Sequence, residues 1–137
     1  MSFVAEILST PHTLAIVGVS QDPDRYGHEV FEAFLADGLR VFPINPKYQH
    51  IDGYPCYPSL DTLPEMPDVV VTAVPPAVTE RVAETCARLG IPALWMTPGT
   101  ESEQAIAFCA ANGVRVVHGF CPVFVLKLPQ ERWHELP

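Results

Sequence analysis

Residues 16–38 read IVGVSQDPDRYGHEVFEAFLADG, a pattern that predicts a strand, a polar turn and a helix. The strand belongs to the continuous apolar run 14–19, which is typical of a strand buried on both faces. The helix, expected over residues 27–37, carries one apolar stripe and stops at Gly38. A turn that joins a buried strand to a helix is a common place for a phosphate group, because the first N–H groups of the helix have no partner within it.

The rest of the chain continues the same alternation of strands and helices. Four further strands are predicted at 40–44, 69–74, 92–96 and 114–118, and further helices at 3–9, 77–89 and 101–112. A long loop with a short helical turn near Leu60–Leu63 follows the second strand, and the tail 119–137 is assigned no element. Strands that alternate with helices imply right-handed crossovers. We therefore expect an α/β fold with a Rossmann-like, doubly wound, parallel five-stranded sheet in three α/β/α layers, as one domain over residues 1–137.

Bulk composition excludes several classes of protein. The chain has 137 residues, 48% of them hydrophobic and 18% charged, which fits a globular domain with its own core. A net charge of -8 disfavours nucleic acid and anionic membranes as partners. The first residues resemble no signal peptide, and no apolar run is long enough for a membrane span. We expect a cytoplasmic protein with reduced thiols at its four cysteines, Cys56, Cys86, Cys109 and Cys121.

The polar turn differs from the glycine-rich fingerprint of NAD-binding proteins. That fingerprint reads G-x-G-x-x-G and is followed by an acidic residue at the end of the second strand. Here Gly18 is followed by no glycine until Gly27, and the second strand ends in Asn45-Pro46-Lys47. Both departures argue against NAD.

The turn still has the chemistry for a phosphorylated ligand. Ser20 supplies a hydroxyl and Arg25 a bidentate guanidinium, and Lys47 brings a second cation at the neighbouring strand end. Of the eight Lys and Arg residues, only these two cations are predicted in strand-end loops. Two cations on the ligand edge of so acidic a chain suggest several phosphates, and a lysine in place of the acidic residue suggests a phosphorylated ribose. NADP and coenzyme A remain as alternatives. His28, in the first helical turn, is expected at the surface.

Two segments resemble the CoA-binding domain family, small stand-alone proteins similar to the N-terminal domain of the succinyl-CoA synthetase alpha subunit. They are GVSQDPDR at 18–25 and GLRVFPINPK at 38–47. The resemblance covers roughly residues 10–121 and continues through segments 53–60, 67–71, 94–99 and 113–117.

The resemblance implies a diphosphate over the Gly18–Arg25 turn and the following helix start, with the adenosine end beside Asn45-Pro46-Lys47 and Val74-Pro75-Pro76. The chain departs from the family at Thr97, where glutamine is common, and in the apolar segment 122–126. These departures leave the thiol end of the ligand unassigned. The predicted ligand site comprises Gly18, Val19, Ser20, Arg25, Gly27, Asn45, Pro46, Lys47, Val74, Pro75, Pro76, Thr97 and Gly99.

The expected function is non-catalytic binding of coenzyme A or an acyl-CoA, with a homodimer or a partner protein left open. No convincing pair of base and nucleophile is present, since His118 and Cys121 lack a third group to orient them. The alternative is a small enzyme, either an NADP-linked reductase or a CoA-thiol redox protein that uses Cys121. Cys121 supports this alternative because it follows the fifth predicted strand on the ligand edge.

Overall fold

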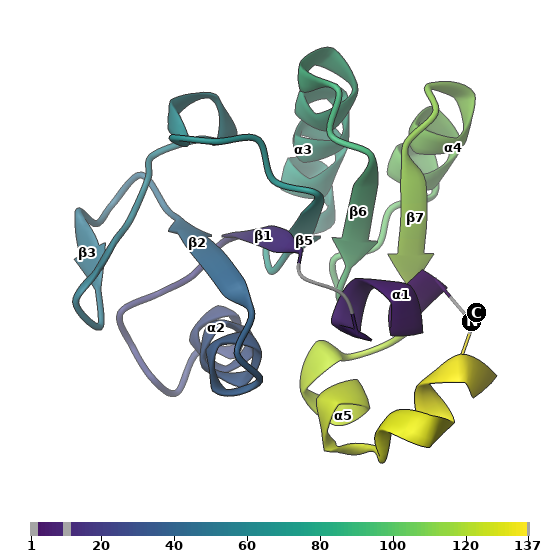
Figure 1. Cartoon of the computed structure of the whole chain (residues 1–137). Coiled ribbons are helices and arrows are strands. Elements are labelled where there is room, and N and C mark those ends of the chain that lie inside the picture. Colours follow the sequence, from purple (N-terminus) through teal and green to yellow (C-terminus); the bar gives the residue numbers. More distant parts are fainter. Residues whose placement is uncertain (1–2, 10–11, 137) are drawn as a thin grey trace.

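The computed structural model describes residues 3–9 and 12–136. Five parallel strands form one sheet in the order β2, β1, β5, β6, β7 (Figure 1). Their bounds are β1 Thr13–Val17, β2 Arg40–Ile44, β5 Val69–Thr72, β6 Ala93–Met96 and β7 Arg115–His118. Numbered along the chain, the five strands have the doubly wound order 2-1-3-4-5. The predicted α/β class and parallel five-stranded sheet are confirmed.

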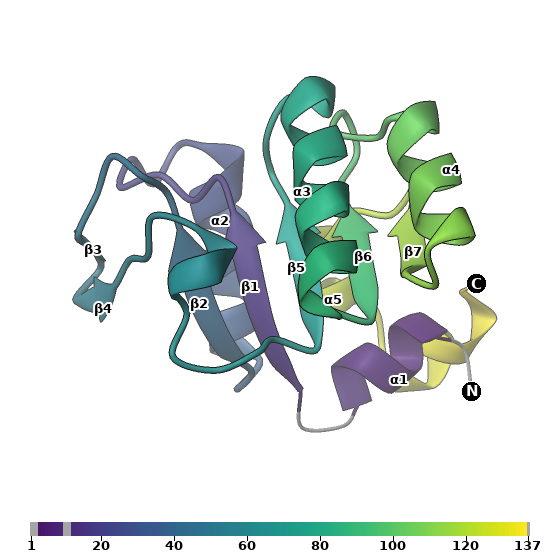
Figure 2. The same cartoon turned by 90° about the horizontal axis from the view of Figure 1, so that it is seen from above.

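Helices cover both faces of the sheet and complete three layers. Helices α2 and α5 lie on one face, and α3 and α4 lie on the other (Figure 2). The helices are α1 Phe3–Ser9, α2 Tyr26–Ala36, α3 Pro76–Leu89, α4 Glu103–Ala111 and α5 Pro122–Lys127, with 3-10 helices η1 Leu60–Thr62 and η2 Gln130–Glu135. Within the described ranges, no helix has the length and apolar character needed to cross a membrane.

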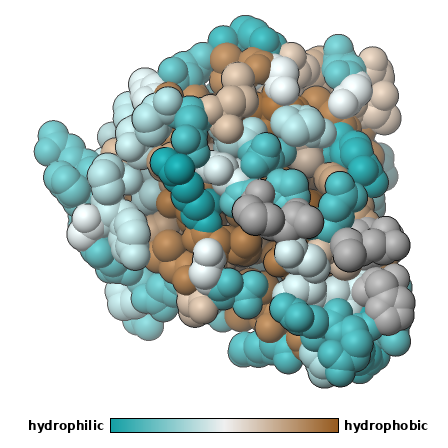
Figure 3. Space-filling view, in the orientation of Figure 1, coloured by the Kyte–Doolittle hydropathy of each residue, from teal (hydrophilic) through white to brown (hydrophobic). Residues whose placement is uncertain are grey.

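The central strands bury both of their faces, so alternate residues enter two separate cores. In β1, Leu14 and Ile16 pack on the α2 side, whereas Ala15 packs on the α3 side. Trp95 of β6 is fully buried on the α2 side, and its indole N–H donates to the Phe120 carbonyl at 3.0 Å. The molecular surface is by contrast largely hydrophilic on the face shown in Figure 3, with apolar atoms visible between polar side chains. Burial of the central strands on both faces explains the uninterrupted apolar runs in the sequence.

Two parts of the chain form elements that the sequence analysis leaves out. The loop after β2 contains a short antiparallel hairpin of β3 His50–Ile51 and β4 Tyr54–Pro55. The tail forms α5 and η2, and α5 packs against α2. Strands β1 and β5 also end about two residues earlier than predicted, because the chain turns away from the sheet at their carboxyl ends.

Candidate functional site

Two glycines allow close backbone contacts at the end of β1: Gly18 lies against Ala73 after β5, and Gly27 brings the start of α2 against Gly18. Gly18 has φ +103°, and a Cβ there would lie 2.3 Å from the Ala73 carbonyl oxygen. A Cβ on Gly27 would lie 2.3 Å from the Gly18 carbonyl oxygen. Gly27 thus allows the close helix–strand approach that the third glycine of a dinucleotide fingerprint provides, although its spacing differs. The strand, the turn and the helix are held together by backbone contacts that leave no room for a side chain.

A hollow of about 450 Å³ opens at the carboxyl ends of β1, β2 and β5, where the strand order reverses. Ligands of doubly wound sheets bind at this point. We call it the switch-point hollow, and its lining residues are Gly18, Ser20, Arg25, Tyr26, Gly27, Asn45, Lys47, Tyr48, Ala73, Val74 and Pro75.

The switch-point hollow is positively charged and offers free backbone donors. Arg25 and Lys47 are exposed, and neither forms an ion pair with any described residue. The backbone N–H groups of Tyr26 and Gly27 begin α2 and have no acceptor among the described residues, whereas those of His28 and Glu29 bond the Arg25 carbonyl. Two unpaired cations and two unpaired N–H groups around one hollow are suited to an anion.

Hydrogen bonds within the polar turn occupy its acidic and hydroxyl groups. The Asp22 N–H donates to Ser20 Oγ at 3.1 Å, and the Asp24 N–H donates to Asp22 Oδ1 at 2.9 Å. Gln21 Nε2 donates to the His50 carbonyl at 2.9 Å and so ties the turn to the hairpin. The Asp22 carboxylate therefore shapes the turn through a local backbone bond.

Asn45 joins the two loops that carry the cations. Its side-chain Nδ2 donates to the Val19 carbonyl at 2.9 Å, and its Oδ1 accepts the Lys47 N–H at 2.9 Å. The Val19 side chain itself is fully buried in the α2-side core. Asn45 is thus a positioning residue that holds Lys47 beside the turn.

An apolar pocket of about 240 Å³ adjoins the same strand ends, and Pro46 lines it while its neighbours line the switch-point hollow. Its other lining residues are Val17, Ile44, Pro58, Ser59, Leu60, Asp61, Val78, Arg81, Val82 and Thr85. Hydrophobic side chains at the bottom and polar groups at the rim suit a flat aromatic ring.

Cys121 is the one cysteine within the described chain that is only half-buried, and it lies beside the first residue of α2. The Tyr26 hydroxyl donates to Cys121 Sγ at 3.0 Å. Burial, together with this hydrogen bond, raises the pKa of Tyr26, so the hydroxyl stays protonated as a donor. Burial raises the pKa of Cys86 to about 12 and raises those of Cys56 and Cys109, which keeps these three as thiols.

The structure brings eight of the predicted site residues together around the switch-point hollow, and places the others elsewhere. Thr97 is buried and donates to the Thr72 carbonyl, and the Gly99 N–H donates to Glu101 Oε1 at 2.8 Å. Val19, Pro46, Pro76, Thr97 and Gly99 do not line the hollow. The eight that do are Gly18, Ser20, Arg25, Gly27, Asn45, Lys47, Val74 and Pro75.

Sequence reasoning missed two aromatic lining residues and misplaced one histidine. Tyr26 and Tyr48 line the switch-point hollow, each directly after one of its cations, and that adjacency is the signal that could have found them. His28 is wrongly predicted at the surface: it is 1% exposed, because the β3–β4 hairpin packs over the first turn of α2.

Fold and site together define a doubly wound α/β domain with an anion-binding hollow at its switch point. A model of the CoA binding domain family matches residues 12–127, and the chain belongs to that family. Membership of this family supports CoA binding in general.

Similar proteins include both stand-alone domains and parts of larger enzymes. A conserved hypothetical protein from Pyrococcus furiosus has a TM-score of 0.78 and 38% identity, over 82% of this chain and 97% of that one. The uncharacterized protein YneT of Bacillus subtilis is 28% identical over 86% of this chain and 87% of its own length. The ADP-forming acetate–CoA ligase I of Archaeoglobus fulgidus is 32% identical over 61% of this chain, which spans 12% of the ligase.

Proposed function

We propose that this chain binds coenzyme A or an acyl-CoA without catalysing a reaction, as a carrier, a sensor or a subunit of a larger assembly. The observation that carries the proposal is a hollow lined by Arg25 and Lys47, which have no ion-pair partner among the described residues, and by the N–H groups of Tyr26 and Gly27, which have no acceptor there. In a chain of net charge -8, two cations that converge on one hollow make it the part of the surface suited to an anionic ligand.

In the proposed pose, CoA extends from the switch-point hollow into the adjoining apolar pocket. The diphosphate lies over the Gly18–Arg25 turn, where the guanidinium and the N–H groups donate to it. The adenine enters the apolar pocket beside Pro46, and the 3′-phosphate on the ribose faces Lys47. The chemistry of each part of the ligand is thus matched by the residues that lie there.

The first test is a calorimetric titration of the chain with CoA, dephospho-CoA and NADP. CoA is expected to bind more tightly than dephospho-CoA, since only CoA carries the 3′-phosphate. Lys47→Ala should weaken CoA binding about tenfold, the size expected for one charge-assisted hydrogen bond. The same variant should change dephospho-CoA binding less than about twofold. NADP binding without CoA binding would contradict the proposal and point to a reductase.

A second candidate function rests on the hydrogen bond between Tyr26 and Cys121. Because Tyr26 also lines the switch-point hollow, Cys121 lies one side chain away from the proposed ligand. In a thiol–disulfide exchange, the Cys121 thiolate would attack one sulfur of CoA disulfide, form a protein–CoA disulfide and release one CoA thiolate.

Intact-mass measurement after incubation with CoA disulfide tests this exchange. The expected result for a redox protein is one CoA adduct that maps to Cys121, with the deeply buried Cys86 unmodified. Tyr26→Phe removes the hydroxyl donor and should slow adduct formation about fivefold. The absence of an adduct, or modification spread equally over the cysteines, would reject the redox function and leave the binding module.

We propose that the chain works as one domain in the cytoplasm, without nucleic acid or membrane as a partner. We propose a second copy of the chain or a ligase-type subunit as its partner, and the similarity to alpha subunits of ADP-forming acetate–CoA ligases supports the latter.

A further inference from the structure

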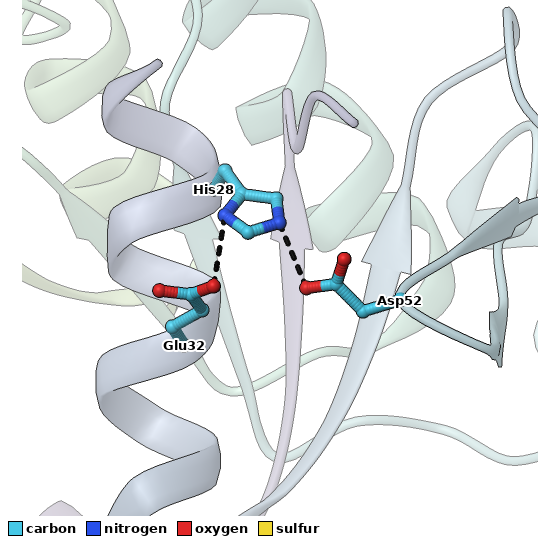
Figure 4. Close-up of side chains that lie close together, drawn as sticks. All are labelled: His28, Glu32 and Asp52. Carbon is cyan, nitrogen blue, oxygen red and sulfur yellow. Dashed lines mark ion pairs between the residues drawn. The ribbon is translucent and has the colours of Figure 1, made fainter. Parts of the chain in front are cut away.

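His28 is buried between two carboxylates at the junction of α2 and the β3–β4 turn (Figure 4). Its side chain is 2% exposed. Nδ1 lies 3.4 Å from Glu32 Oε1, one helical turn further along α2, and Nε2 lies 2.8 Å from Asp52 Oδ2. Despite these short distances, neither ring nitrogen has a hydrogen-bond partner in the described chain, and both are buried.

The cluster has no lysine or arginine partner: neither Glu32 nor Asp52 pairs with one among the described residues. A neutral imidazole has one N–H and one lone pair, so with a carboxylate at each nitrogen the lone pair faces an anion. A buried polar side chain in such surroundings is costly unless a positive charge completes the cluster. That charge is either a second proton on the ring or a metal ion.

We propose that His28, Asp52 and Glu32 bind a divalent transition-metal ion of the Zn²⁺ class. One imidazole nitrogen and two carboxylate oxygens form a donor set that suits Zn²⁺, Co²⁺ or Ni²⁺ better than Mg²⁺ or Ca²⁺, which prefer oxygen donors alone. The three donor atoms already lie within 4.8 Å of one another. Tetrahedral Zn²⁺ requires donor spacings of about 3.4 Å, given bonds of roughly 2.1 Å.

The donor atoms must move closer than 4.8 Å to bind an ion, and the exposed carboxylates have more room to move than the buried ring. The side chains of Glu32 and Asp52 are 57% and 46% exposed. The Asp52 carboxylate already lies beside Nε2, and the Glu32 carboxylate has room to turn from Nδ1 toward an ion held at Nε2. Water would supply the remaining coordination. Asp52 reaches the site because it has φ +51° and lies before Gly53 in the tight β3–β4 turn. The ion would therefore connect the hairpin to the first turn of α2.

The metal site shares no residue with the switch-point hollow, so it stands or fails independently of CoA binding. The test is equilibrium dialysis of the metal-stripped full chain against Zn²⁺, with bound metal counted by mass spectrometry. One ion per chain is expected. Asp52→Asn and Glu32→Gln keep side-chain size at exposed positions, and each should weaken binding about tenfold or more. Glu84→Gln and His118→Gln, both exposed and distant, are the matched controls and should change affinity less than twofold.

Co²⁺ supplies the second measurement, because its visible spectrum and paramagnetic NMR shifts report the ligands directly. We expect Co²⁺ to shift the ring resonances of His28 and Zn²⁺ to compete with it. Two results would overturn the proposal: an affinity that Asp52→Asn and Glu32→Gln leave unchanged, or a His28 ring that still carries protons on both nitrogens at saturating Co²⁺. The latter would assign the missing charge to a proton.

Discussion

The Gly27→Ala variant is expected to be less stable than the parent by about 2 kcal/mol, with a thermal midpoint roughly 6 °C lower. Helix propensity alone predicts the opposite sign, because alanine in a helix is favoured over glycine by up to about 1 kcal/mol. The reason for the reversal is steric: the added Cβ would lie 2.3 Å from the Gly18 carbonyl oxygen. Thermal and urea unfolding followed by circular dichroism measure the change.

Gly38→Ala is the matched control for this experiment. Gly38 has φ +83°, and no heavy atom would lie within 4 Å of an added Cβ. Its substitution should cost only the backbone strain of a left-handed alanine, about 1 kcal/mol. A Gly27→Ala variant as stable as the parent would show that α2 does not need its close approach to β1. In the expected case, α2 moves outward and the two free N–H groups move with it, so CoA affinity should fall as well.

The Arg25→Ala variant is expected to bind CoA about 30-fold more weakly, a loss of roughly 2 kcal/mol. Arg25 occupies the N-cap position of α2 without a side-chain capping bond, lines the switch-point hollow and forms no ion pair with a described residue. Its guanidinium would donate two parallel hydrogen bonds to the diphosphate, and the variant loses both. Isothermal titration calorimetry measures the affinity.

Two further variants separate geometry from charge. Arg25→Lys keeps the charge but loses the planar fork, so it should recover only part of the affinity. Lys127→Ala removes an exposed cation of α5 that does not line the switch-point hollow, and it should bind CoA like the parent. Equal losses in Arg25→Ala and Lys127→Ala would mean that only net charge matters, and would remove the argument for a built diphosphate site.

Most of the sheet could be predicted because burial on two faces leaves a strong signal. Segments such as 14–19 and 92–96 are continuously apolar, and only a strand covered by helices on both sides needs that pattern. The hairpin was missed although its Asp52-Gly53 pair is a strong signal for a tight turn, since its strands have only two residues each. Helix α5 was missed because its short apolar face is explained only by contact with α2.

The sequence predicted the sheet edge where the candidate site lies better than it predicted the residues that line the site. The rule that ligands bind at the carboxyl ends of parallel strands placed Arg25 and Lys47 on one edge, and both line the hollow. The same rule also placed Thr97 and Gly99 at this edge, but Thr97 donates to the Thr72 carbonyl of the neighbouring strand and the Gly99 N–H donates to the Glu101 side chain. A position next to a strand end predicts the sheet edge on which a residue lies. It does not predict where the side chain points, because that depends on the turn that follows the strand.

The sequence by itself determined the alternation of strands and helices, the acidic surface and the few cations that an anionic ligand could meet, because these depend on local pattern and composition. Only the tertiary structure decided which groups converge. The neighbouring positions of β1, β2 and β5 bring Arg25 and Lys47 around one hollow, and the fold-back of the hairpin buries His28 against Asp52. Contacts between residues more than twenty positions apart have no signature in either partner's own neighbourhood, since they arise from strand order and close packing.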